Sequence, residues 1–266
     1  MTFISGYLAL FFYLTTIGLI AVQVKSALDH EDTPFNSWIR ISWISAIVCH
    51  AIILFSPLLS NQSLHLDFFT AASHVAWITS LLLLITTWSR QVHVLGLIIL
   101  PLAVASLIAS HLNMDTTTTA INGPLATHIL LSLLGYSFLF LATLQALLVR
   151  FQNQHLHNHK PGGIIRALPS LQDMEHLLFR LLLTGTLLLY AGLVTGFIFL
   201  DDLFGQHVLH KTVLTIIALA IYTTLLLGHW KFGWRGKLAV KWTLIAFALL
   251  ILAYFGSKFV YEFLLR

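Results

Sequence analysis

Eight long apolar runs dominate this 266-residue sequence and leave few ways for the chain to fold. Each run is about 20 residues long, the length that an α-helix needs to cross a bilayer core. Backbone groups in lipid must be hydrogen bonded internally, so such runs cross as helices. The sequence therefore predicts an all-α, polytopic membrane bundle of about eight transmembrane helices. The expected spans are residues 3–24, 38–59, 67–87, 92–112, 124–149, 177–200, 207–229 and 240–263.

The composition excludes a water-soluble domain. Hydrophobic residues make up 58% of the chain and charged residues 9%, whereas soluble domains carry about 25% charged residues. The net charge of +4 is interpreted as a topology signal, so no nucleic-acid partner is expected. Because Cys49 is the single cysteine, the chain has no internal disulfide and no CxxCH motif for covalent haem attachment.

The basic residues predict how the helices are oriented. If the N-terminus lies outside, eleven Lys and Arg residues fall on one side of the membrane and three on the other. The positive-inside rule makes the first side cytoplasmic, so both termini are predicted to be periplasmic in a bacterial inner membrane. Residues 1–266 are expected to form one integral membrane domain. Its longest cytoplasmic connection, 150–176, should begin as a flexible loop and become an amphipathic helix from Leu171 onward.

Histidine is unusually common, with 14 residues against 10 Asp and Glu together. An ionisable side chain inside a span is a candidate functional residue. His50 and His128 lie within different spans at compatible heights, assuming a rise of about 1.5 Å per residue. Two imidazoles on opposite faces of a flat ring suit haem iron. The sequence therefore favours a non-covalent, b-type haem whose iron is held by His128, with His50 as the opposite ligand.

Other interpretations of these histidines stay open. A neutral imidazole can simply hydrogen bond a helix backbone or a neighbouring hydroxyl, which we expect for His74 and His93. The same packing role remains an alternative for His50 and His128. A zinc site would need three or four closely placed ligands, and no such set lies inside a span.

Five stretches resemble the cytochrome c assembly protein family of haem-handling membrane proteins (CcsA-, CcmC- and HemX-like), and within it the YpjD-type branch. They are VCHAI (48–52), THILLSLLGYSFLFLATLQALL (127–148), LPSLQDMEHLLFRLLLTG (168–185), GHWKFGWRGKLAVKW (228–242) and LAYFGSKF (252–259). The resemblance implies haem handling or cytochrome c assembly without enzymatic activity. It also implies partners among cytochrome assembly or haem-biosynthesis proteins. By position, His128 corresponds to a periplasmic haem ligand of the family, and His229 to a histidine implicated in haem passage.

The chain departs from the family between its sixth and seventh spans. Members that present haem to apocytochrome carry a tryptophan-rich loop there, whereas this chain reads FLDDLFGQHVLHKTVL (199–214), without tryptophan. His207 and His210 lie at the expected depth of a missing periplasmic ligand and are kept as further candidates. Without that loop, an alternative function is a cofactor-free membrane regulator or scaffold for a partner such as a haem-biosynthesis protein.

Overall fold

The predicted helical architecture is present in the structure. The computed structural model describes residues 2–28, 37–61, 63–65, 67–88, 93–112, 118–120, 123–157, 168–199 and 209–256. Within these ranges eight helices are long and apolar enough to cross a membrane. Large apolar side chains such as Phe11, Leu14 and Phe197 are exposed, as lipid-facing residues should be because lipid tails solvate them.

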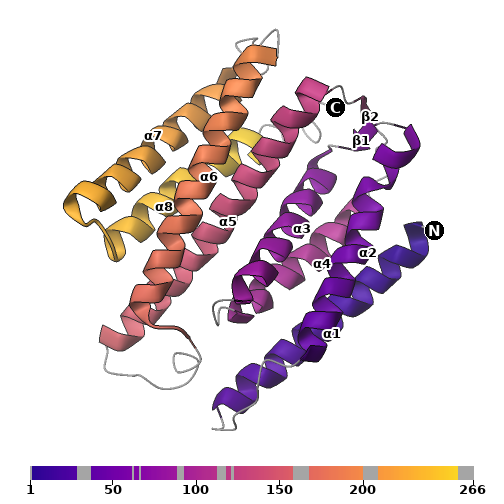
Figure 1. The fold of residues 1–266 in the computed structure, drawn as a ribbon, viewed down its shortest axis with the longest axis horizontal. Coiled ribbons are helices and arrows are strands. Elements are labelled where there is room, and N and C mark those ends of the chain that lie inside the picture. The colour runs from indigo at the N-terminus through magenta and orange to yellow at the C-terminus, as the bar shows by residue number, and fades with distance from the viewer. Residues whose placement is uncertain are drawn as a thin grey trace. The chain divides into compact units, whose positions relative to one another are not determined.

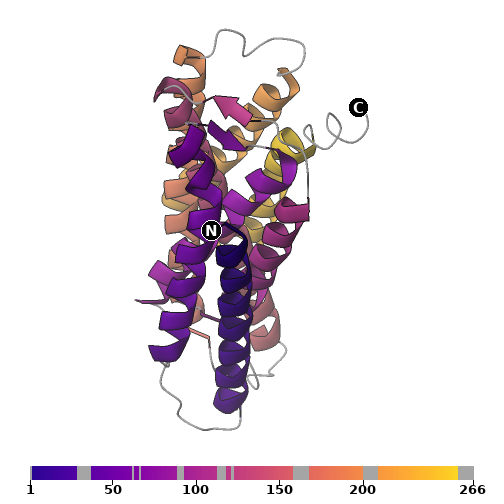
Figure 2. The same cartoon turned by 90° about the vertical axis from the view of Figure 1, so that its right-hand side faces the viewer.

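The chain divides into two compact units. The first comprises residues 1–120 and 155–170, and the second comprises 121–154 and 171–266. The helices of the first unit are α1 (Thr2–Leu28), α2 (Ser37–Asn61), α3 (Phe68–Thr87) and α4 (Gly96–Leu112), the last preceded by a 3₁₀ turn, His93–Leu95. Within this unit α1 packs against α2 and α4, and α3 packs against α4 and α2 (Figure 1, Figure 2).

Hydrogen bonds between side chains of different helices hold the first unit together. The Trp43 indole donates to Ser80 Oγ at 2.8 Å, which joins α2 to α3. The Thr16 hydroxyl lies 2.9 Å from Ser42 Oγ, which joins α1 to α2. Such bonds matter in a membrane, where apolar side chains gain little by leaving lipid, and each contributes about 0.6–2 kcal/mol.

A short two-stranded sheet was missed by the sequence interpretation. Strands β1 (Ser63–His65) and β2 (Thr118–Ala120) pair antiparallel, with Leu64 opposite Thr119. Both belong to the first unit and connect the ends of α2 and α4. Three residues are too few to show the alternation by which strands are recognised.

The helices of the second unit are α5 (Gly123–His157), α6 (Leu171–Phe199), α7 (Leu209–Phe232) and α8 (Lys237–Ile251), which continues as a π-helical turn, Leu252–Gly256. Small residues bring α5 and α6 close together. A Cβ placed on Gly135 would lie 3.1 Å from the Leu189 backbone nitrogen, and one on Gly185 would lie 2.8 Å from Leu139 Cγ. The close approach at Gly135 is therefore to the backbone of α6.

The expected loop at 150–176 is wrong in its first part. Residues 150–157 continue α5 to His157, and Gln152 there is buried. These residues contain no Pro or Gly, so nothing stops the helix before the Pro-Gly-Gly at 161–163, which lies outside the described residues. The expected amphipathic second part is confirmed, because α6 begins at Leu171 and buries Met174, Leu178 and Leu181.

Candidate functional site

His50 is completely buried in the first unit and has both ring nitrogens hydrogen bonded. Its Nδ1 lies 3.1 Å from the Tyr13 hydroxyl on α1, and its Nε2 lies 2.9 Å from Ser73 Oγ on α3. The ring therefore links three helices. To coordinate a metal, His50 would have to exchange one of these two bonds for the metal.

His74, the next residue after Ser73, shows the backbone bond that the sequence predicted. Its Nδ1 donates to the Thr70 carbonyl oxygen, one turn earlier in α3, at 2.8 Å. Phe55 packs edge-on against the ring, with centroids 5.9 Å apart. Its buried Nε2 has no hydrogen-bond partner among the described residues. His74 is thus a packed imidazole with one ring nitrogen unused.

His128 lies in the second turn of α5, where it faces α6. Its Nδ1 is 2.8 Å from the carbonyl oxygen of Gly192. A carbonyl can only accept, so Nδ1 carries the proton and the lone pair of the neutral ring is on Nε2. Metal-ligating histidines commonly have this arrangement, in which a backbone carbonyl fixes the tautomer and the ring orientation. The close approach at Gly192, where a Cβ would lie 3.0 Å from Ser132 Oγ, lets the carbonyl come within reach.

His229, in the last turn of α7, has the same arrangement. Its Nδ1 lies 2.8 Å from the carbonyl oxygen of Trp234, so its lone pair is also on Nε2. The ring stacks on Phe179 of α6, with centroids 3.4 Å apart and planes inclined by 11°. His128 and His229 therefore each offer an oriented Nε2, from opposite ends of the second unit's helices.

The GWRG sequence after His229 forms the turn that holds this ring. Gly233 has a φ of 67°, and the Trp234 backbone N–H bonds the Gly228 carbonyl at 3.3 Å. The Gly233 N–H also bonds the His229 carbonyl four residues earlier, at 3.0 Å. This is an αL helix ending, in which glycine adopts the left-handed conformation at little cost. Gly236, with a φ of 61°, then donates its backbone N–H to the Glu175 carboxylate at 3.0 Å. The turn thus aims the Trp234 carbonyl at His229 and joins α6 to the start of α8.

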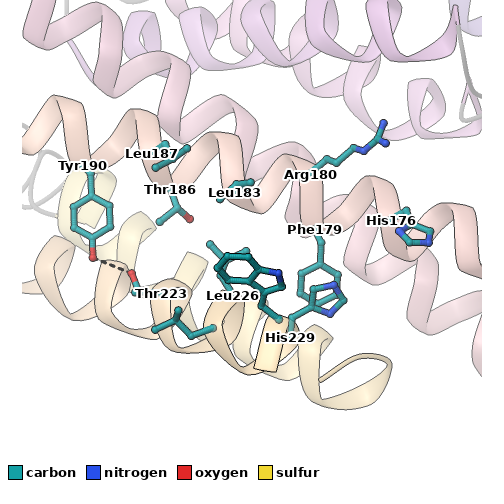
Figure 3. Close-up of a pocket in the computed structure, with 12 residues that line it drawn as sticks. His176, Phe179, Arg180, Leu183, Thr186, Leu187, Tyr190, Thr223, Leu226 and His229 are labelled. Atoms are coloured by element: carbon teal, nitrogen blue, oxygen red, sulfur yellow. Dashed lines mark hydrogen bonds between the residues drawn. The ribbon is translucent and has the colours of Figure 1, made fainter. Parts of the chain in front are cut away.

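A groove of about 530 Å³ lies between α6 and α7, and His229 lines it (Figure 3). This volume is in the range of small-molecule sites. Its wall is largely apolar, with four leucines, Phe179 and Trp230 among the lining residues. The Tyr190 hydroxyl, 2.8 Å from Thr223 Oγ1, bridges the two helices farther along. The sequence analysis missed this groove. Its signal was the α6 stripe at 176, 180, 183, 187 and 190, which repeats at helical spacing but carries polar residues.

The structure adds little about the two further candidate ligands, His207 and His210. His210 is exposed in the first turn of α7, and His207 lies outside the described residues. His50 belongs to the first unit and His128 to the second, so their expected sharing of one iron stays a prediction. No group of three or more His, Cys, Asp or Glu side chains with metal-binding geometry occurs in the described parts of the chain.

The sequence pattern of the family described as "Cytochrome C assembly protein" matches residues 38–265. The chain belongs to the cytochrome c assembly protein family. It is 30% identical to the inner membrane protein YpjD of Escherichia coli strain K12, over 97% of this chain and 98% of that protein.

Two further relatives are similar over about half of the chain. An uncharacterized 28.8 kDa protein of Azospirillum brasilense is 36% identical over 52% of each chain. Protein HemX of Brevibacillus brevis is 27% identical over 50% of this chain and 49% of that protein. No solved structure matches the chain. The comparisons therefore confirm the family and the YpjD-like and HemX-like relationship that the sequence indicated.

Proposed function

We propose that this protein binds haem non-covalently in a bacterial inner membrane and handles it in haem trafficking or cytochrome c assembly. One observation carries the proposal. The Nδ1 atoms of His128 and His229 each donate to a backbone carbonyl at 2.8 Å, which orients each ring and, in the neutral form, puts the lone pair on Nε2. Neutral imidazoles presented in this way are ligands for haem iron.

The groove between α6 and α7 supports the proposal at His229. The wall of this groove is largely apolar and aromatic, which suits a macrocycle. It also contains the buried Thr186 hydroxyl, which has no hydrogen-bond partner among the described residues. A polar atom left in this state fits a site that a ligand completes. When bound, haem supplies an iron that accepts an imidazole lone pair, and the chain's own residues orient the ring and exclude water.

His128 and His229 are proposed as ligands of separate haem positions because they lie at opposite ends of their helices. His128 starts α5, whereas His229 ends α7. His50 is proposed as the opposite iron ligand at the His128 position. To coordinate iron there, it would lose its hydrogen bond to Tyr13 or to Ser73. Partners among cytochrome assembly or haem-biosynthesis proteins follow from the same proposal.

Visible spectra of the detergent-purified protein, expressed with ample haem, test this function. We expect a Soret band, and we expect both His128→Ala and His229→Ala to lower or shift it. The double variant should lose most of the bound haem. His157→Ala is the matched control, because this imidazole is exposed at the end of α5 and should leave the spectrum unchanged.

Two outcomes would contradict the proposal. A colourless wild-type protein would favour the cofactor-free regulator or scaffold. A wild-type spectrum in the double variant would show that haem is held elsewhere. The same spectra test His50, because His50→Ala should alter the band if His50 ligates iron and should only lower thermal stability if it links three helices.

A further inference from the structure

The α6–α7 groove has chemically different parts. At the end where α6 begins, it is bordered by His176 and Arg180, one helical turn apart. The middle is lined mainly by apolar side chains, among them Leu183 and Leu187. At the far end Tyr190 bonds Thr223 across the two helices (Figure 3). The groove therefore has basic side chains at one end, a largely apolar middle and a pair of hydroxyl groups at the other end.

Arg180 has no counter-ion within the described chain, because no carboxylate there forms an ion pair or hydrogen bond with it. In Figure 3 its side chain extends away from α7. The side chain is exposed, and its flexible stem allows the guanidinium to reach the groove end where His176 lies. A guanidinium and an imidazole together favour a carboxylate or phosphate.

Thr186 supplies a second polar contact, deeper in the groove. Its side chain is only 3% exposed, and its Oγ1 has no partner among the described residues. Most intramembrane threonines avoid this state by donating to the carbonyl four residues earlier, as Thr143 and Thr243 do. A ligand acceptor atom at this depth would satisfy the Thr186 hydroxyl.

The aromatic side chains at the groove favour a flat ligand over an acyl chain. Trp230 and the stacked pair of Phe179 and His229 line the same end of the groove. Flat conjugated rings stack on such surfaces, which adds favourable contacts that a flexible hydrocarbon tail does not make. A fatty acid would also place its single carboxylate at Arg180 and leave the Thr186 hydroxyl without an acceptor.

We propose that this groove binds a tetrapyrrole dicarboxylate, one acid group at Arg180 and His176 and the other at Thr186, whether or not the ring contains a metal. The proposal rests on the proposed haem-handling function and names the residues that recognise the ligand's acid groups. Ring stacking and the two acid contacts require no iron. Binding of a metal-free ring is therefore a property of the groove itself.

The test uses the full-length protein in detergent, with quenching of its tryptophan fluorescence by metal-free protoporphyrin IX or by the dimethyl ester of protoporphyrin. The free acid should bind at least about tenfold more tightly than the ester, because charge-assisted hydrogen bonds are lost on esterification. Arg180→Leu should remove most of this preference. Thr186→Val, which keeps the side-chain shape, should weaken binding of the free acid severalfold.

Lys231→Leu is the matched control. It removes the same charge from the last turn of α7, and Lys231 does not line the groove. Equal affinity for the acid and the ester would overturn the proposal, as would an unchanged preference in Arg180→Leu. Displacement of the porphyrin by oleate or phosphatidylglycerol at equal or lower concentration would identify the groove as a lipid site instead.

This result is separable from the haem spectra. Metal-free protoporphyrin has no iron for an imidazole to ligate, so its binding does not depend on His128 or on the Nε2 of His229. If the acid preference is found but the histidine variants keep a wild-type haem spectrum, ligation by these histidines fails and the groove assignment stands. If the histidine variants lose haem but acid and ester bind equally, only the groove assignment fails.

Discussion

At the scale of single residues, backbone carbonyls fix the tautomers of His128 and His229, as a carbonyl also does for His74. His128 and His229 donate Nδ1–H to the carbonyls of Gly192 and Trp234, and each keeps an Nε2 lone pair. His50 has no such freedom, since hydroxyls engage both of its nitrogens. Depth in the bilayer, the criterion used on the sequence, could not separate these cases because hydrogen-bond partners come from other helices.

Gly228→Ala tests whether the turn controls His229. An alanine Cβ at this position would overlap the Trp234 ring, whose backbone carbonyl holds His229. We expect a loss of about 1–3 kcal/mol in stability from overpacking, together with weaker or altered haem binding. Thermal unfolding and the visible spectrum measure the two effects. Gly18→Ala is the control, because nothing lies within 4 Å of its added Cβ and it should be neutral or slightly stabilising. An unchanged spectrum in Gly228→Ala would show that the Trp234 carbonyl is not needed.

At the scale of helices, the spans were predictable because about 20 apolar residues are required by the bilayer itself. The GWRG turn was recognised only as a resemblance, and the structure gives the physical reason in the positive φ angles of Gly233 and Gly236. Helix ends were less predictable. Polar residues such as those at 150–157 are compatible with both loop and helix, and α5 includes them.

Glu175→Ala tests the link between α6 and the α7–α8 turn. The Glu175 carboxylate accepts the backbone N–H of Gly236, and its loss leaves that donor without a protein partner. Since Glu175 is half-buried, we expect about 1 kcal/mol of destabilisation, measured by thermal unfolding in detergent. Glu175→Gln keeps an acceptor oxygen and should lose less. Gln172→Ala, at an exposed position of the same helix, should have little effect. Equal stability of Glu175→Ala and the wild type would mean that water replaces the carboxylate without cost.

At the scale of the whole molecule, the number of spans was evident in the sequence but their grouping was not. A single membrane domain was expected, and the structure contains two compact units that divide the chain near residues 120, 154 and 170. Apolar runs look alike whichever neighbour they pack against. The contacts that define each unit, such as Trp43 with Ser80 or Gly135 with Leu189, depend on single positions within those runs.

The orientation of the whole molecule is predicted by its basic residues. Eleven of the 14 Lys and Arg residues fall on one side when the eight helices alternate, and that side should be cytoplasmic. Arg180 and the end of α7 with His229 then lie toward the cytoplasm, and His128 lies toward the periplasm.

In cells, a phosphatase or fluorescent reporter fused at residue 160 should behave as cytoplasmic, and one fused at residue 204 as periplasmic. Replacing the three basic residues on the sparse side would increase the asymmetry between the two sides, so it should not change this pattern. The reverse pattern would exchange the membrane sides of the His128 and His229 positions.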